Sequence, residues 1–292
     1  MSPIELPEYT PLFYAQEKGR YFRHEFIRKI EAETKRSLIV YFADVRHPNG
    51  SIDRDDIAPF GDLLQKAGPD LDLLIHSPGG DIDAAEKIVY MCRSNTKSFR
   101  VIVPEYAKSA ATLIALAADI ILMGYASELG PIDPQIVITT PEGRSVQRPA
   151  RSFLDGLEDI KKKVKEDGEL SPVYYPPLSQ LDPALLDYCN KAIKRSREFA
   201  VKWLKEHMLR DSPDKAEKIA DRLLDVNTYL LHGIVIDHTE AEKIGLAVEF
   251  LPADNALWKA IWYLYCIYQA DIKATRGETA KFFESGSVSI RS

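Results

Sequence analysis

Residues 71–81 read LDLLIHSPGGD, and this stretch decides the fold. Its apolar run is typical of a buried strand, and the run stops at the turn formed by Ser77, Pro78, Gly79 and Gly80. Adjacent glycines let the backbone adopt positive φ and approach another group closely. Their N–H groups can then point outward and hold the negative oxygen of a carbonyl under attack. Because such a turn is also common without any chemistry, a second feature has to decide its role.

The composition is that of an ordinary soluble globular protein. The 292 residues are 45% hydrophobic and 28% charged. A net charge of -6 argues against a nucleic-acid-binding face, which would be basic. The three cysteines, Cys92, Cys189 and Cys266, lie far apart and have no metal-binding or disulfide spacing. We therefore expect a reducing compartment, with these cysteines as small core residues.

Neither end of the sequence reads as a membrane segment. The N-terminal MSPIELPEYT has acidic residues and prolines where a signal peptide would carry basic residues and an apolar core. The most hydrophobic aromatic stretch, residues 257–270, contains Lys259 and is too short to span a bilayer. We expect a cytoplasmic protein with no integral membrane segment.

Apolar runs and amphipathic segments alternate through the first half of the chain. Strands are expected at residues 37–44, 71–76, 99–103 and 120–123, and helices at 53–67, 83–94 and 109–118. The strands are apolar on both faces, which is typical of a parallel sheet covered by helices on both sides. The sequence predicts an α/β fold with a parallel sheet flanked by helices.

Three regions are expected along the chain. Residues 1–36 form an N-terminal helical extension, in which Phe22, Phe26 and Ile30 supply the apolar positions. Residues 37–252 form the sheet domain, which carries a charged helical insertion at about 150–226. Residues 253–292 are expected to form a C-terminal helix and a flexible tail rich in Ser, Gly and Thr.

Ser109 is the second feature that bears on the glycine turn. It precedes the apolar helix AATLIALAA and follows the strand that comes after residues 71–76. Because a right-handed crossover brings the ends of neighbouring parallel strands to one edge, Gly79, Gly80 and Ser109 are expected to lie together there. A helix N-terminus also favours negative charge. The alternative is that Ser109 is only an N-cap.

Four segments carry a family resemblance. HSPGGDIDAAEKIVYMCR looks like the turn and helix of the Clp peptidase and crotonase superfamily, and YAKSAATLIALAAD is similar to its serine-bearing segment. SELGPIDPQ and DHTEAEKIGLAVEF resemble the passage that follows and the closing helix and strand. The chain most resembles the serine dehydrogenase proteinase family of Clp-fold serine proteases, over about residues 37–140 and 227–251.

This resemblance implies a serine peptidase. Ser109 would be the nucleophile that forms an acyl-enzyme, and the N–H groups of Gly79 and Gly80 would form the oxyanion hole. It also implies a polypeptide substrate and a homo-oligomer, a ring built from trimer-type units. We expect no cofactor or metal, because the sequence contains neither a phosphate-binding Gly-rich Lys loop nor a His/Cys cluster.

The sequence does not decide which residue is the base that activates the serine, and several candidates remain. His232 precedes the closing segment, and Asp133 in GPIDP is placed to orient a His or to position its loop. Lys108 is a further candidate, although neighbouring side chains on a helix diverge by about 100°. His76 is a weaker candidate base, and Ser77 is a rival nucleophile whose place before a proline suits a turn.

Two other functions compete with the peptidase. A crotonase-type enzyme acting on an acyl-CoA thioester would use the same oxyanion hole, with Glu105 and Glu128 flanking the site. A non-catalytic Clp-fold scaffold would use the helical block at 150–226 as its partner surface. The absence of a His about two dozen residues after Ser109, where the Clp peptidase has one, keeps the scaffold alternative open.

Overall fold

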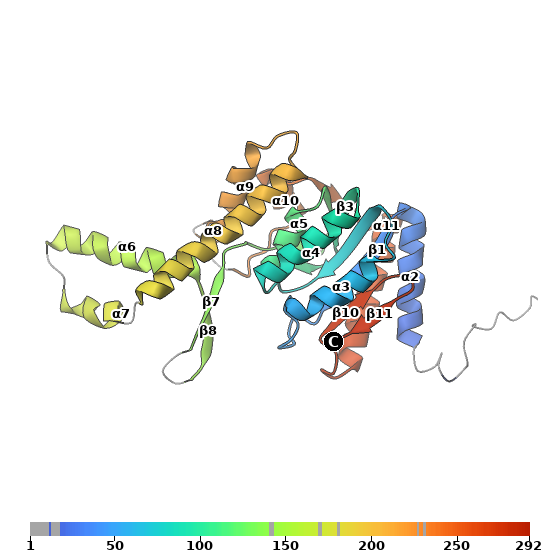
Figure 1. Cartoon of the computed structure of the whole chain (residues 1–292), viewed down its shortest axis with the longest axis horizontal. Helices are drawn as coiled ribbons and strands as arrows, with labels where there is room; N and C mark the ends of the chain where they lie inside the picture. Colours follow the sequence, from blue (N-terminus) through green and yellow to red (C-terminus); the bar gives the residue numbers. More distant parts are fainter. Residues whose placement is uncertain are drawn as a thin grey trace, which may run out of the picture.

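The apolar strands of the first half of the chain assemble into one central sheet (Figure 1). The computed structural model describes Leu12 and residues 18–139, 143–168, 171–179, 182–226, 228–229 and 232–292. Within these ranges the largest sheet has seven strands, in the order β11 (Ser289–Arg291), β10 (Lys281–Glu284), β1 (Ser37–Ala43), β2 (Asp70–His76), β3 (Ser98–Val103), β5 (Ile120–Met123) and β9 (Val248–Phe250). The run from β1 to β9 is parallel, as predicted.

Helices cover both faces of this sheet because consecutive strand residues, which point to opposite faces, are apolar. On β1, Ile39 and Tyr41 pack into the core beneath α3 (Ile57–Leu64), α4 (Ile82–Asn95) and α5 (Ala110–Leu116). Val40 and Phe42 pack into a second core with α2 (Lys18–Thr34) and α11 (Ala256–Ala274). The expected α/β architecture is confirmed, with the fully buried α5 inside the first core.

The expected flexible C-terminal tail is wrong. Strand β10 pairs antiparallel with β1, and Phe282 and Phe283 are buried. Its terminal residues Lys281 and Glu284 are also buried, in ion pairs with carboxylates and with an arginine. The strand was not predicted because its terminal residues are charged and the surrounding sequence is rich in Ser and Gly. Charged side chains can nevertheless be buried when an oppositely charged partner pairs with them.

Helix α2 exists as predicted, but it buries a different face. Ile27 and Ile30 are buried, whereas Phe22 is exposed and Phe26 only partly buried. Arg23 is buried as well, because its guanidinium donates to both carboxylate oxygens of Glu284. With Arg23 in this ion pair, α2 packs against the sheet through the face that carries Arg23, Ile27 and Ile30. The face that carries Phe22 and Phe26, which the sequence predicted to be buried, is turned away.

The insertion predicted at about 150–226 is preceded by a hairpin and begins with helices that reach away from the sheet (Figure 1). The hairpin consists of β7 (Gln135–Thr139) and β8 (Ser145–Pro149), and it packs with α6 (Ala150–Asp167) and α8 (Pro183–Glu206). Two short helices, η2 (Pro172–Tyr174) and α7 (Tyr175–Ser179), lie between α6 and α8 in the chain. We call β7, β8, α6, α7 and the first half of α8 the arm.

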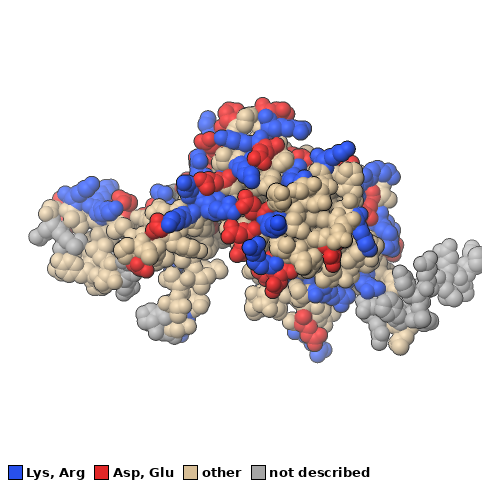
Figure 2. All heavy atoms as spheres, in the orientation of Figure 1, with Lys and Arg blue, Asp and Glu red and all other residues tan. Residues whose placement is uncertain are grey.

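The second half of α8 belongs to the main core rather than to the arm. Phe199 and Trp203 of α8 pack with Ile219 and Leu223 of α9 (Lys215–Leu224) in the core above α5. On the face shown in Figure 2, basic side chains gather along α6 of the arm, and much of the remaining arm surface is uncharged. The later part of the predicted insertion therefore shares a hydrophobic core with the sheet, whereas the arm has a small cluster of its own.

The remaining elements are short. They are η1 (Arg54–Asp56), β4 (Tyr106–Ala107), β6 (Glu128–Leu129) and α10 (His238–Ile244). Among the cysteines, Cys92 and Cys189 are buried as expected, but Cys266 is exposed, because it lies on the outer face of α11. In the described part of the chain, no helix combines the length and the apolar character that crossing a bilayer requires.

Candidate active site

The Gly79-Gly80 turn follows β2 and lies against the backbone of Ile52. The Ile52 N–H donates to the Gly79 carbonyl, and the Ile52 carbonyl accepts from Asp81 N–H, both at 2.8 Å. The glycines have φ of +95° and +150°. A Cβ on Gly80 would lie 2.2 Å from the Ile52 oxygen, and one on Gly79 would lie 2.8 Å from Ser109 Cβ. Only glycine fits at these positions, and the turn and Ser109 are in contact.

Ser109 lies between β4 and α5 in a strained backbone conformation. Residues other than glycine rarely adopt its backbone angles, a φ of 52° and a ψ of −117°. A strained strand–turn–helix junction is a known way to expose a nucleophile. Ser109 occupies the N-cap position of α5, but its partly exposed side chain makes no capping hydrogen bond, so helix capping does not account for it.

Two backbone N–H groups beside Ser109 have no acceptor among the described residues. They belong to Gly80 and to Ala110, the first residue of α5, whose N–H has no partner within the helix. The Ala110 nitrogen lies 2.9 Å from the position that a Cβ on Gly79 would take. Gly79 N–H, by contrast, donates to Ser77 Oγ at 3.1 Å. Sequence reasoning missed Ala110, although its place after Ser109 at a helix start was a usable signal.

Asp133 and His232 meet, although they were weighed separately in the sequence. His232 Nδ1 lies 2.7 Å from Asp133 Oδ1, and the other carboxylate oxygen accepts from Gln135 Nε2 at 2.6 Å. The Asp133 side chain is 5% exposed and the His232 side chain 25%. A buried carboxylate that holds one ring nitrogen orients the imidazole and leaves the other nitrogen for chemistry.

Lys108 lies against the loops that carry this pair. Its Nζ donates to the carbonyl oxygens of Leu129 at 2.9 Å and Ile234 at 2.8 Å, and lies 3.1 Å from Glu128 Oε1. Burial lowers the pKa of the ammonium, while Glu128 acts in the opposite direction. With three acceptors around it, the Lys108 ammonium is held by the loops that flank the site.

Backbone hydrogen bonds hold the two loops to each other and to the core. Leu129 and Ile236 exchange N–H···O bonds of 2.9 and 3.1 Å. Ile132, beside Asp133, donates to the Leu223 carbonyl at 3.0 Å and accepts from Ser196 Oγ at 2.7 Å. Lys108 and these contacts therefore tie the loops with Asp133 and His232 to the segment that carries Ser109.

The other sequence candidates are held in structural roles. His76 is buried between the Ala43 carbonyl and Glu105, at 2.9 and 2.7 Å from its two nitrogens. The hydrogen bond from His76 lowers the pKa of Glu105, against the effect of burial. The fully buried Ser77 hydroxyl accepts from Gly79, which suits a turn residue and not a nucleophile.

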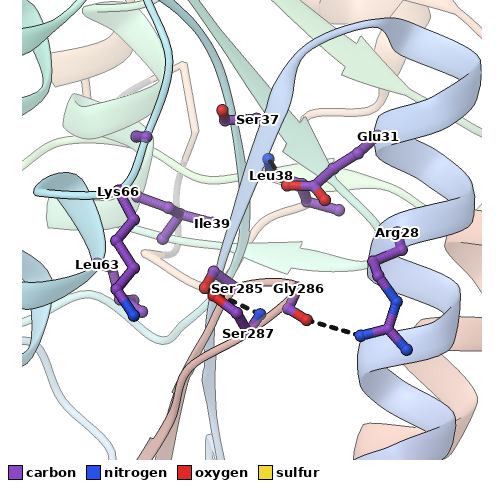
Figure 3. Close-up of a pocket in the computed structure, with 11 residues that line it drawn as sticks. Arg28, Glu31, Ser37, Leu38, Ile39, Leu63, Lys66, Ser285, Gly286 and Ser287 are labelled. Carbon is purple, nitrogen blue, oxygen red and sulfur yellow. Dashed lines mark hydrogen bonds between the residues drawn. The ribbon is translucent and has the colours of Figure 1, made fainter.

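A separate pocket lies away from this site (Figure 3). Its volume is about 280 Å³, and Arg28 donates to the Gly286 carbonyl at its rim. Ser37, which lines the pocket, is the first residue of β1. The pocket therefore lies at the amino end of β1, whereas Ser109 lies near the carboxyl ends of the parallel strands. Among the described residues, no three His, Cys, Asp or Glu side chains are grouped to hold a metal ion.

Comparisons with known proteins identify relatives of this chain. An uncharacterized protein of Methanocaldococcus jannaschii, MJ1495, is 30% identical over 204 residues, which is 66% of this chain and 61% of that protein. A second, MJ0137, is 33% identical over 179 residues, 61% of this chain and 53% of that protein. The chain thus spans less than two thirds of the length of either relative.

A solved structure with similar architecture is ClpP1 from Listeria monocytogenes. The two chains are 15% identical and superpose with a TM-score of 0.42, and the alignment covers 81% of this chain and 99% of ClpP1. The family model described as ClpP-like SDH-type serine proteinase matches residues 64–279, which include the glycine turn, Ser109, Asp133 and His232. The chain therefore belongs to the family of ClpP-like SDH-type serine proteinases.

Proposed function

We propose that this protein is a serine peptidase whose nucleophile is Ser109. The proposal rests on the conformation of Ser109, whose backbone is strained at a φ of 52°. Its hydroxyl makes no capping hydrogen bond to α5, and the residue lies beside Gly79. Strain of this kind costs about 1–3 kcal/mol and persists where the surrounding structure enforces it. A plain N-cap would need no such conformation.

In the proposed reaction, Ser109 Oγ attacks a peptide carbonyl and transfers its proton to His232 Nε2. The Nδ1 atom of His232 stays hydrogen-bonded to Asp133, which stabilises the imidazolium that forms. The carbonyl oxygen becomes negative and accepts from the N–H groups of Gly80 and Ala110. Collapse of the tetrahedral intermediate breaks the C–N bond, and the leaving amine takes the proton from His232. Water then hydrolyses the acyl-enzyme by the reverse sequence of proton transfers.

His232 is favoured over Lys108 as the base because their hydrogen-bond partners differ. A base must have a lone pair directed at the serine, and Lys108 Nζ already donates to two carbonyls and lies beside Glu128. His232 is held at one nitrogen only by Asp133. The crotonase alternative is disfavoured in the same way, because Glu105 is engaged by His76 and Tyr265.

A fluorophosphonate probe tests the nucleophile. Wild-type protein should be labelled covalently, and Ser109→Ala should not be labelled. Ser94→Ala is a matched control, because Ser94 is exposed on α4 away from the glycine turn. Equal labelling of wild type and Ser109→Ala would refute the assignment. Hydrolysis of fluorescently labelled casein, lost in the same variant, would establish a polypeptide substrate.

We further propose that the protein acts in the cytoplasm as a homo-oligomer, a ring of trimer-type units. Exposed apolar side chains on the arm support an association surface; they are Val137, Val173, Tyr175 and Tyr188. Sedimentation velocity measures the assembly directly. A monomer at micromolar concentration would contradict the proposed ring.

A further inference from the structure

Lys281 is a buried cation on β10 that holds two carboxylates of the loop preceding α3. Its side chain is 3% exposed, and its Nζ donates to Asp53 Oδ2 at 2.8 Å and Asp56 Oδ1 at 2.7 Å. Asp56 is also buried. A buried charge of this kind is retained only when partners satisfy it, so the three residues form one unit.

The same loop is in direct contact with the Gly79-Gly80 turn. Asp53 and Asp56 form a capping box at η1, in which Asp53 N–H donates to Asp56 Oδ2 at 3.0 Å. Ile52, the residue before Asp53, brackets Gly80 through its hydrogen bonds with Gly79 and Asp81. A displacement of the loop would therefore move the backbone that carries the Gly80 N–H.

A second connection runs from the same carboxylate to the turn through side chains. Tyr41 OH donates to Asp56 Oδ2 at 2.9 Å. The Ser77 side chain lies close enough to the Tyr41 hydroxyl to lower the pKa of the phenol, against the larger raising effect of burial. Ser77 Oγ accepts from Gly79 N–H at 3.1 Å. Ser77 therefore contacts the Gly79 N–H and lies beside Tyr41, whose hydroxyl is bonded to Asp56.

We propose that Lys281, Asp56 and Tyr41 are positioning residues for the oxyanion hole. They fix the Gly79-Gly80 turn from two sides, through the Ile52 backbone and through Ser77. This inference rests on the proposed function, because it assigns these residues an effect on the reaction of Ser109. Oxyanion donors act only when they are held in place before the reaction, so small shifts of the turn slow acylation.

Two matched tyrosine variants test the proposal. Tyr41→Phe and Tyr268→Phe each remove one buried hydroxyl that donates to a carboxylate, and the acceptors are Asp56 and Glu284. Tyr268 packs on the opposite face of the sheet, in the core with α2 and α11. Both variants should lower Tm to a similar extent. Only Tyr41→Phe should slow acylation of Ser109 by a fluorophosphonate, by about tenfold, with the initial affinity for the probe unchanged.

Lys281 is tested by a pair of substitutions at its own position. Lys281→Met should slow acylation at least as much as Tyr41→Phe, and Lys281→Arg should restore part of the rate because it keeps the charge and donors. If Lys281→Met does not fold, the tyrosine pair decides. Equal acylation rates for Tyr41→Phe and Tyr268→Phe would overturn the proposal.

Amide hydrogen exchange separates this proposal from the proposed function. Peptides covering residues 77–81 should exchange faster in Tyr41→Phe than in wild type or Tyr268→Phe. Unchanged exchange in this segment would refute the positioning role whether or not the protein is a peptidase. If wild-type protein is not acylated at all while exchange responds as expected, the peptidase assignment fails and the structural connection stands.

Discussion

The Nδ1 atom of His232 lies 2.7 Å from Oδ1 of Asp133, across 99 residues of sequence. The carboxylate comes from the passage after β6, and the imidazole from the loop before α10. The carboxylate therefore precedes the imidazole in the chain, and both follow Ser109.

Loss of either member of this pair is expected to slow the reaction without unfolding the protein. His232→Ala should lower kcat for labelled casein by about 10²–10⁴-fold, because a positioned base contributes about that much. Asp133→Asn should lower it by a similar order, because the amide does not stabilise the imidazolium. The His238→Ala control, at the start of α10, should retain the wild-type rate. A His232→Ala enzyme with unchanged kcat would exclude His232 as the base.

Removal of the Lys108 ammonium is expected to affect stability first. Lys108→Met leaves the Leu129 and Ile234 carbonyls without their buried donor and should cost about 2–3 kcal/mol of unfolding free energy. Lys97→Met is the control, because Lys97 is exposed. Chemical denaturation gives the loss of stability, and fluorophosphonate labelling gives the effect on Ser109. A Lys108→Met protein as stable as wild type but as inert as Ser109→Ala would instead identify Lys108 as the base.

A side chain at Gly80 is expected to abolish acylation. In Gly80→Ala the new Cβ would lie 2.2 Å from the Ile52 oxygen at a φ of +150°, so the turn must move. Gly143→Ala is the matched control, with a positive φ of +78° but no heavy atom within 4 Å of the new Cβ. It should cost only about 1 kcal/mol and leave acylation of Ser109 unchanged. Similar acylation rates for the two variants would show that the turn is not part of the site.

Stability is expected to fall in mild acid because of His207, which stacks on Trp203. Burial, and then the positive charge of Arg93, lower the pKa of His207 from 6.5 to about 4. As the pH falls below 6.5, His207 becomes protonated in the unfolded chain, but in the folded protein it stays neutral until about pH 4. The free energy of unfolding therefore decreases as the pH is lowered from 6.5 to about 4. His207→Gln should flatten this part of the profile.

Urea unfolding at a series of pH values measures the effect of His207. The control is His47→Gln, in the turn after β1, whose ring contacts the Gly277 carbonyl and not His207 or Trp203. The control should keep the wild-type decrease between pH 6.5 and about 4. An identical pH dependence in His207→Gln and wild type would show that other groups control acid stability.

Local sequence patterns predicted the parallel strands, the glycine turn and the position of Ser109. Residues 71–81 and the helix after Ser109 are apolar over whole segments, and such runs determine strand and helix without knowledge of distant residues. The edge rule for parallel strands then brings Gly79 and Ser109 together, and the structure has them in contact.

The remaining features depend on contacts that no local pattern encodes. The meeting of Asp133 and His232 depends on loops joined by Leu129 and Ile236. Strand β10 was missed because the buried Lys281 is satisfied only by carboxylates more than 200 residues earlier in the chain. In each case a polar group in the interior is explained by a partner that only the folded chain supplies.

The position of β10 in the sheet also determines when the chain can complete its fold. Val40 of β1 pairs with Glu284, so the edge of the sheet beside β1 stays open until the ribosome has made nearly the whole described chain. Lys281 arrives on that same strand and reaches the loop behind the glycine turn. A nascent chain would therefore carry Ser109 before its surroundings are fixed. Under the proposed function, acylation of Ser109 would therefore reach its full rate only after β10 has paired with β1.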